Sequence, residues 1–507
     1  MSNLKRYCVA LANGSLYVDK TVGVMDAVSS VVKFTDDKVI QSTEYNQKLY
    51  IADYAETVVE GTDGVLSSSG TVLDASGVTD WTALGIDTGL HAIYLSNIGG
   101  SGTTFGTYAI ATVAAGSITL ISPGTAVDGT CDYKIFVCPK YYDPTLDNIS
   151  FWIATTGAIP QNCSIISRYR SRIVLAGDPE APHLWYMSRV GDPLDWDYSQ
   201  SDVSRAVAGQ DTDSGAIGDK ITAIIPFSTD YLVFGCHSSI WMMYGDIANG
   251  GSINNVSYTA NIFSSTSWCY GPNSEVLFLS KDGLYSLSYS SDDGVVLKLL
   301  SESLPEAFKN IESDYYDISM SYDMFNSGLN IFITSKGLAT TTHYWLDWQT
   351  QSFWPMSLQQ DHEPTIVFNR TSYVASEENS ILGCRDGYIR QFDRNMTTDD
   401  GDTITNYVNI GPIRLGNGYN EGMLAELMGT LGTGSGDVTW DVYVGKTVSE
   451  AIDADSFATG VWTEGRNLNS RPRARGDSLF IKLTGEADKT WAVEEMMMTG
   501  SAKGRLR

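Results

Sequence analysis

The sequence predicts an all-β protein: a β-propeller of about six blades with an inserted β-domain and a C-terminal β-sandwich. Three observations lead to this prediction, namely a repeated hexapeptide, a composition rich in glycine and aromatic residues, and alternation of apolar and polar residues near the C-terminus. The chain has 507 residues, including 48 Gly, 28 Tyr and 12 Trp, and only 18% of its residues are charged. Aromatic residues and glycine favour strands that are joined by tight turns.

A hexapeptide frame, in which apolar residues run into a small residue and then a polar turn, recurs in the middle of the chain. The start-to-start spacings of its copies are 44, 54 and 50 residues. A period of about 40–50 residues is typical of propeller blades. Asp282 and Asp386 within the frame are predicted to form turns by accepting hydrogen bonds from nearby amides. The copies are FGCHSS at 234–239, FLSKDG at 278–283, FITSKG at 332–337 and LGCRDG at 382–387.

Two further segments have the strand pattern of blades. Near the N-terminus, residues 31–40 and 47–54 are rich in β-branched and aromatic residues and flank a turn, which predicts a strand pair. Residues 165–196 contain the apolar runs RIVLAG and HLWYMS around a Pro-containing turn. With the copies of the frame, these segments give about six blades. Stacking blades around an axis buries sheet faces that one blade alone leaves exposed.

The remaining segments define the other domains. Residues 61–77 are rich in Gly, Ser and Thr and are interpreted as a linker, and the frame is absent up to residue 148. The segment SESLPEAFKNI at 301–311 is the best candidate for a short helix, since Pro305 suits a first helical turn. The predicted division is propeller strands at 1–64, an inserted β-domain at 65–148, propeller blades at 149–400 and a β-sandwich at 411–507.

The predicted sandwich rests on a period of two in the apolar residues. Such alternation is typical of antiparallel strands with one buried face. Two strands of a small β-sandwich are therefore expected around residues 438–444 and 479–483. The apolar positions are Val438, Trp440, Val442 and Val444, and then Leu479, Ile481 and Leu483.

The net charge of −27 argues against a protein that grips nucleic acid, because that affinity comes mainly from Lys and Arg on phosphates. An acidic wall would instead let DNA pass without binding it. Residues 461–507 differ, with nine Lys or Arg and six Asp or Glu, so this end is +3 and the rest is −30. Two interpretations stay open: a solvated basic surface, or a docking face for an acidic neighbour, with Arg471, Arg473 and Arg475 as contacts.

The chemistry-bearing residues form no recognisable site. Seven cysteines without a C-x-x-C pair predict buried free thiols, not zinc ligands or disulfides. GKT at 445–447 lacks the upstream glycine of a phosphate loop, and DTDSG at 211–215 lacks the full ligand set of a calcium loop. The five histidines are dispersed. The sequence thus predicts no catalytic, cofactor-binding or metal site, no cofactor and no enzymatic activity.

Tryptophans at predicted blade positions have two interpretations. They are expected in the core, and the alternative is a set of platforms for sugars. The tryptophans concerned are Trp185, Trp196, Trp241, Trp345, Trp348 and Trp354.

No apolar run approaches the ~20 residues that span a membrane. The stretch after Lys5 and Arg6 is too short for a signal peptide, so synthesis in the cytoplasm is expected.

Four stretches resemble one family. RYRSRIVLAGDPEAPHLWYMSRVGDPLDW at 168–196 combines an R-x-R-apolar strand, a W-Y-x-S-like strand and a D-P-x-D-W-like turn. WCYGPNSEVLFLSKDGLYSL at 268–287, YWLDWQTQSFWPM at 344–356 and the Gly- and Arg-rich end at 471–507 complete the set. Together they resemble the tail-nozzle, or packaged-DNA-stabilisation, proteins of short-tailed bacteriophages. The resemblance covers 165–395 and 411–507.

The resemblance implies a structural virion protein made in the host cytoplasm and found in the tail. It implies a homohexameric ring below the portal and its adaptor, which contacts other tail proteins, surrounds duplex DNA without sequence-specific binding and retains it until ejection. No membrane is involved. An alternative stays open, since aromatic residues and 60 carboxylates also suit a glycan-binding or glycan-degrading propeller, such as a tail depolymerase or receptor-binding protein.

Overall fold

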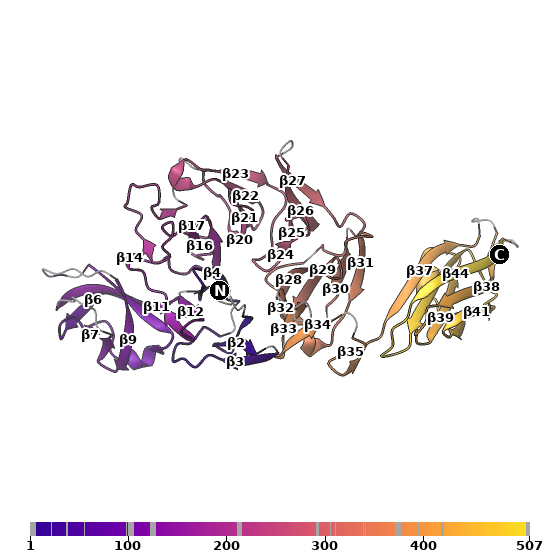
Figure 1. The fold of residues 1–507 in the computed structure, drawn as a ribbon, viewed down its shortest axis with the longest axis horizontal. Helices are drawn as coiled ribbons and strands as arrows, with labels where there is room; N and C mark the ends of the chain where they lie inside the picture. Colours follow the sequence, from indigo (N-terminus) through magenta and orange to yellow (C-terminus); the bar gives the residue numbers. More distant parts are fainter. Residues whose placement is uncertain are drawn as a thin grey trace, which may run out of the picture. The chain divides into compact units, whose positions relative to one another are not determined.

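The structure is a computed structural model, in which nearly all regular structure is strand (Figure 1). The chain divides into two units, Met1–Phe392 and Asp393–Arg507. In the described residues the single α-helix is α1 (Val448–Asp453), and short 3-10 turns are η1 (Trp81–Leu84), η3 (Ile247–Asn249) and η4 (Gln360–His362). Described are residues 7–502 except 22, 37–38, 55, 98, 100–105, 122–127, 210–214, 291–293, 305, 310, 338, 340, 371–377, 394–395 and 417–419.

In the part of the first unit that the structure describes, seven antiparallel sheets follow one another around a ring, which confirms the predicted propeller (Figure 1). The first three sheets are β1 (Val9–Ala12), β2 (Ser15–Thr21) and β3 (Val24–Ala27); β4 (Gln41–Tyr45), β5 (Lys48–Ala52), β12 (Lys140–Asp143) and β13 (Asn148–Phe151); and β15 (Ile165–Tyr169), β16 (Arg172–Ala176), β17 (Trp185–Met187) and β19 (Val207–Ala208). A short parallel pair, β14 (Thr156–Gly157) and β18 (Asp195–Trp196), lies beside them in sequence.

The other four sheets have the same order of strands in space and in sequence. They are β20 (Ile221–Pro226), β21 (Tyr231–Cys236), β22 (Ile240–Tyr244) and β23 (Ser252–Ser257); β24 (Trp268–Tyr270), β25 (Val276–Ser280), β26 (Gly283–Ser290) and β27 (Gly294–Leu299); β28 (Tyr316–Asp323), β29 (Gly328–Ser335), β30 (His343–Asp347) and β31 (Ser352–Met356); and β32 (Pro364–Arg370), β33 (Asn379–Cys384) and β34 (Ile389–Phe392).

The inner sheets of the ring bury both of their faces against their neighbours. On β16, Ile173 and Leu175 pack toward the preceding sheet, whereas Val174 packs toward the following one. On β21, Phe234 packs toward the preceding sheet and Val233 packs toward the following one. This explains why the middle strands are continuous apolar runs, since strands buried on both faces do not alternate. First strands of adjacent sheets also contact each other, as β15 does with β4 and β20.

The ring closes between the first and last sheets. Arg370 Nη1, at the end of β32, lies 2.8 Å from Asp19 Oδ2 on β2, and the two side chains are 15% and 4% exposed. Sheet β1–β3 thereby adds a blade to the number that the sequence predicts. In the sequence this blade is indicated by the pair Asn13-Gly14, which lies between two apolar runs. Both residues have positive φ, 48° and 66°, as a two-residue hairpin turn requires.

The hexapeptide frame occupies the same place in four sheets, the connection between the second and third strands. It joins β21 to β22, β25 to β26, β29 to β30 and β33 to β34. Asp386 Oδ1 accepts a hydrogen bond from Tyr388 N (3.1 Å), as expected of a turn former. Gly387 has φ of 84°, a conformation that favours glycine. Asp282 instead accepts from the Tyr285 hydroxyl, at 2.7 Å.

The inserted β-domain is a closed six-stranded barrel that occupies this same connection in the second sheet, between β5 and β12. The barrel spans residues 57–137, whereas the sequence suggested 65–148, because residues 140–151 return to the propeller as β12 and β13. Its strands are β6 (Thr57–Ser67), β7 (Val72–Ala75), β8 (His91–Ser96), β9 (Gly106–Ala114), β10 (Ser117–Leu120) and β11 (Gly129–Val137).

Three local predictions were wrong. Residues 61–77 form β6 and β7 instead of a linker, and a Cβ on Gly61 would lie 2.5 Å from the Tyr133 hydroxyl, so this glycine allows close approach. The described part of 31–40 contains no strand, and the hairpin is β4–β5. The described residues of 301–309 contain turns and no helix, and Phe308, 1% exposed, packs against Tyr344.

The second unit is a two-sheet sandwich, as predicted. Trp462 and Trp440 lie in its core, and Val438 and Val442 are buried while Thr439 and Asp441 between them are half-buried. One sheet contains β37 (Tyr407–Arg414), β43 (Ser478–Gly485), β39 (Val438–Gly445) and β40 (Ala458–Trp462); the other contains β41 (Gly465–Ser470), β42 (Ala474–Gly476), β38 (Gly422–Leu431) and β44 (Val493–Ala502). The pair β35 (Thr398–Asp399) and β36 (Asp402–Thr403) precedes them.

GKT at 445–447 ends β39 and begins α1. Thr447 is the N-cap, and its side chain accepts a hydrogen bond from Glu450 N (3.1 Å). The Glu450 carboxylate accepts in turn from Lys446 N, at 3.0 Å. The motif therefore forms a helix cap of the Thr-x-x-Glu type, not a phosphate loop.

A buried ion pair lies where the barrel joins the propeller. Lys140 opens β12 and Asp53 follows β5; both side chains are fully buried and form an ion pair. Asp53 Oδ1 also accepts a hydrogen bond from Thr35 N (3.1 Å). Burial holds the pKa of Lys140 below its usual range, although Asp53 opposes this shift. The pair thus connects the two chain segments that enter and leave the barrel.

We expect Lys140→Met to lower the free energy of unfolding by about 3–5 kcal/mol, because it leaves the Asp53 carboxylate buried without its cation. Urea denaturation followed by circular dichroism measures this loss. The control Lys20→Met removes an exposed pair with Asp147, whose side chains are 38% and 44% exposed, and should cost under about 1 kcal/mol. Equal losses in the two variants would contradict a structural role for the buried pair.

Candidate functional site

The three arginines singled out in the sequence lie together on the outer side of one sandwich sheet. Arg471, Arg473 and Arg475 are exposed and alternate with buried Pro472 and Ala474. Arg471 Nε lies 3.4 Å from Glu426 Oε1, with both side chains well exposed. An ion pair of this kind contributes little in water, so the guanidinium groups remain available for other contacts.

The same sheet face continues into an apolar strip. Leu468 and Met497 are 47% and 40% exposed, and Met428 lies directly opposite Met497 in the sheet register. Within the described residues, β44 pairs only with β38 and leaves its other edge open. Exposed Met, Leu and Arg next to a free strand edge are features of protein-binding surfaces. We call this surface the arginine–methionine face.

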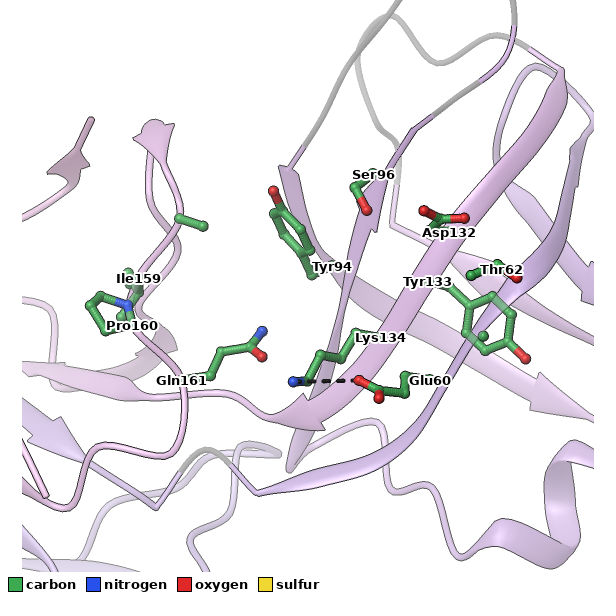
Figure 2. A pocket seen from close by; sticks show the side chains of 12 residues that line it. Glu60, Thr62, Tyr94, Ser96, Asp132, Tyr133, Lys134, Ile159, Pro160 and Gln161 are labelled. Carbon is green, nitrogen blue, oxygen red and sulfur yellow. Dashed lines mark ion pairs between the residues drawn. The ribbon is translucent and has the colours of Figure 1, made fainter. Parts of the chain in front are cut away.

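A groove separates the barrel from the propeller (Figure 2). Its volume is about 650 Å³. One wall is the outer face of β6, β8 and β11, and the other is the segment 158–161 that follows β14. The lining residues are Glu60, Gly61, Thr62, Tyr94, Ser96, Asp132, Tyr133, Lys134, Ala158, Ile159, Pro160 and Gln161.

Strand register arranges the polar side chains of the barrel wall. Lys134 on β11 lies opposite Glu60 on β6 and Tyr94 on β8, and Asp132 lies opposite Ser96. Lys134 Nζ is 3.5 Å from Glu60 Oε2 (Figure 2). The Asp132 carboxylate accepts a hydrogen bond from the Asn97 amide. Two rows of polar groups therefore face the segment 158–161.

Apolar packing fixes the two walls relative to each other. Tyr94 and Phe136 of the barrel pack in one cluster with Phe151 and Ile153 of the propeller. No pattern in the sequence indicates this groove, because its residues come from four separate segments. The Lys134–Tyr94–Glu60 row could be recognised only from the strand register.

A second cluster of titratable groups is buried between the last two propeller sheets. His343 and Glu363 are fully buried, with His343 Nε2 3.9 Å from Glu363 Oε1. Arg385 Nη2 lies 3.3 Å from Glu363 Oε2. His343 Nδ1 accepts a hydrogen bond from Ile333 N (3.1 Å), so the neutral ring carries its proton on Nε2. Burial, with the Arg385 cation, lowers the pKa of His343 to about 4.

The other residues that the sequence analysis considered have structural surroundings. Trp185, Trp196 and Trp345 are buried in the core, whereas Trp354 is 49% exposed. Six of the seven free cysteines are buried. In the described residues, no three His, Cys, Asp or Glu side chains are arranged to hold a metal, and no helix is long and apolar enough to cross a membrane. Residues 211–214 of the DTDSG segment lie outside the described residues.

Comparison with known proteins gives a likeness of fold. No family model matches the chain, and neither does any curated protein. Virginiamycin B lyase from Staphylococcus aureus is similar in structure, with 8% identity and a TM-score of 0.33, over 69% of this chain and 92% of the lyase. Kluyveromyces lactis Hsv2 has 10% identity and a TM-score of 0.30, over 70% of this chain and 94% of Hsv2. Both proteins are β-propellers.

This comparison contradicts the expectation that the chain has no enzymatic activity. A structurally similar protein, the lyase, is an enzyme. The expectation of no enzymatic activity is therefore withdrawn. At 8% identity and a TM-score of 0.33, the likeness also assigns no reaction to this chain.

The His343 cluster generates a prediction about pH. The folded-state pKa of about 4 lies below the ordinary value of 6.5, so the unfolded chain binds the extra proton first. The stabilisation from neutral His343 is complete above about pH 6.5 and is lost as the pH falls toward about 4. His343→Asn keeps an acceptor for Ile333 N and removes this titration. The slope of unfolding free energy against pH should decrease by up to about 1.4 kcal/mol per pH unit.

Urea denaturation at several pH values between these limits measures the slope. His183→Asn changes an exposed histidine and serves as the matched control. If the His343→Asn and His183→Asn slopes agree with that of the unmodified protein, the buried imidazole has no part in acid sensitivity.

Proposed function

We propose that this protein is a structural component of a short-tailed phage virion, a tail nozzle in which copies of the chain form a ring below the portal and its adaptor. The ring surrounds the DNA path and retains packaged DNA until ejection. The observation that carries the proposal is the sequence resemblance in four stretches. Three of them fall on separate blades, at β15–β18, β24–β26 and β30–β31, and the fourth includes the three arginines of the arginine–methionine face.

The R-x-R motif of the first stretch supports the proposal through its structural role. Arg172 is fully buried, donates to Ser188 O (2.8 Å) and lies 3.1 Å from Asp246 Oδ2, which follows β22. Arg170 pairs with Asp230 at the start of the next hairpin. Both arginines therefore join one blade to the next, which is a structural role for the motif in this chain.

Charge supports the passage of DNA. Residues 393–507 contain 12 Lys or Arg and 17 Asp or Glu, a net charge of −5, which leaves −22 on residues 1–392 (−27 + 5). A strongly acidic propeller repels the phosphate backbone and offers few cationic contacts. The arginine–methionine face suits the opposite task, docking to an acidic, partly apolar neighbour in the tail.

The ring is tested by negative-stain electron microscopy of the purified protein and of phage tails carrying a tagged copy. We expect closed rings of the free protein, or tagged density at the tail tip. A strictly monomeric protein that is absent from virions would contradict the proposal.

The docking surface is tested by Arg471→Gln, Arg473→Gln and Arg475→Gln in one chain. We expect at least about tenfold less incorporation into tails, since three charge contacts are lost, with a melting temperature that stays nearly unchanged because all three side chains are exposed. The matched control neutralises three exposed propeller lysines, Lys220, Lys281 and Lys298. Equal incorporation of the two triple variants would contradict docking through these arginines.

A further inference from the structure

We propose that the groove between the barrel and the propeller binds a short oligosaccharide built of neutral or amino sugars. This binding site goes beyond the structural role proposed above and does not depend on it. It would give the inserted barrel a ligand of its own.

The size of the groove fits such a ligand. Its volume, about 650 Å³, lies within the range of about 300–1,000 Å³ that small-molecule sites occupy. The barrel wall consists of adjacent β-strands, and the apolar cluster of Tyr94 with Phe151 and Ile153 fixes that wall against the propeller. A preformed groove binds without a large ordering cost.

The polar groups of the groove match a row of sugar hydroxyls. In the described structure, the side chains of Tyr94, Ser96 and Gln161 form no hydrogen bond within the chain, and all three line the groove (Figure 2). A hydroxyl and an amide can each donate and accept, as sugar hydroxyls do. The Asp132 carboxylate adds strong acceptors beside Ser96.

The apolar groups of the groove match the C–H face of a sugar ring. Figure 2 shows Tyr94 on the barrel wall and Ile159 and Pro160 on the opposite wall, with Gln161 next to them. Aromatic and proline rings offer flat apolar surfaces, while the tyrosine hydroxyl stays available for hydrogen bonding. A ligand with polar edges and apolar faces suits this combination better than a purely apolar ligand does.

The charge of the groove selects against anions. Among the described residues that line the groove, Glu60 and Asp132 contribute two negative charges, and the single cation, Lys134, lies 3.5 Å from Glu60. The lining therefore has a net charge of −1, which repels phosphates and acidic sugars. Neutral sugars avoid this cost, and an amino sugar gains from it.

The proposal is tested with the full-length protein and four trisaccharides: maltotriose, chitotriose, the glucosamine trimer and trigalacturonate. Isothermal titration calorimetry should detect at least one neutral or amino trisaccharide with a Kd of about 1 mM or tighter, and weaker or no binding of trigalacturonate. Gln161→Ala and Asp132→Ala should each weaken that binding about tenfold. Thr112→Ala, on an exposed site of β9 that is not part of the groove lining, should leave it unchanged.

Three results would overturn the proposal. They are no binding of any neutral or amino trisaccharide, tightest binding of trigalacturonate, or equal affinities in the Gln161→Ala variant and the Thr112→Ala control. Asp132 is hydrogen-bonded to Asn97, so its variant is checked by circular dichroism, whereas Gln161 has no such partner and keeps the test valid if that variant misfolds.

Discussion

The structure depends on one constraint: an inner blade of this propeller is apolar on both faces and needs two neighbours to bury them. On β16, side chains one residue apart point into different apolar clusters, so this sheet forms no core of its own. A row of such sheets must end in a closed ring or leave two apolar faces in water. The ring closes through the pair of Arg370 and Asp19, a polar contact between the first and last blades. Stability is therefore shared around the ring.

Because the apolar packing lies between the sheets, the connections between their strands are free to vary. Four blades use the link between second and third strands for a short turn with the hexapeptide frame. One blade uses it for a complete barrel, and the ion pair of Asp53 and Lys140 joins the two chain segments at its base. The groove is a consequence of that insertion, since one wall belongs to the barrel and the other to residues 158–161. A groove thus arises where a second fold meets the first.

The charged residues fall into two groups, one buried and paired and the other exposed. Inside, Arg172 and Lys140 are buried and paired, where removal of one partner costs far more than an exposed pair contributes. Outside, the excess of carboxylates and the exposed arginines of the sandwich set which neighbours can approach. Burial of the first group holds the fold together, while solvent exposure of the second leaves the surface free for partners.

The sequence by itself determined the fold class, because spacing and alternation report directly on burial. The period of the frame predicted the blades, and the alternation around Trp440 predicted the sandwich. Only the tertiary structure decided the structural role of particular small and apolar residues. Gly61 allows the approach of Tyr133 and does not mark a linker, and the segment around the buried Phe308 forms turns where a helix was expected. The arginines at 471–475 could be found as a charge cluster, but the groove could not, because strand pairing brings Glu60, Tyr94 and Lys134 together across long stretches of chain.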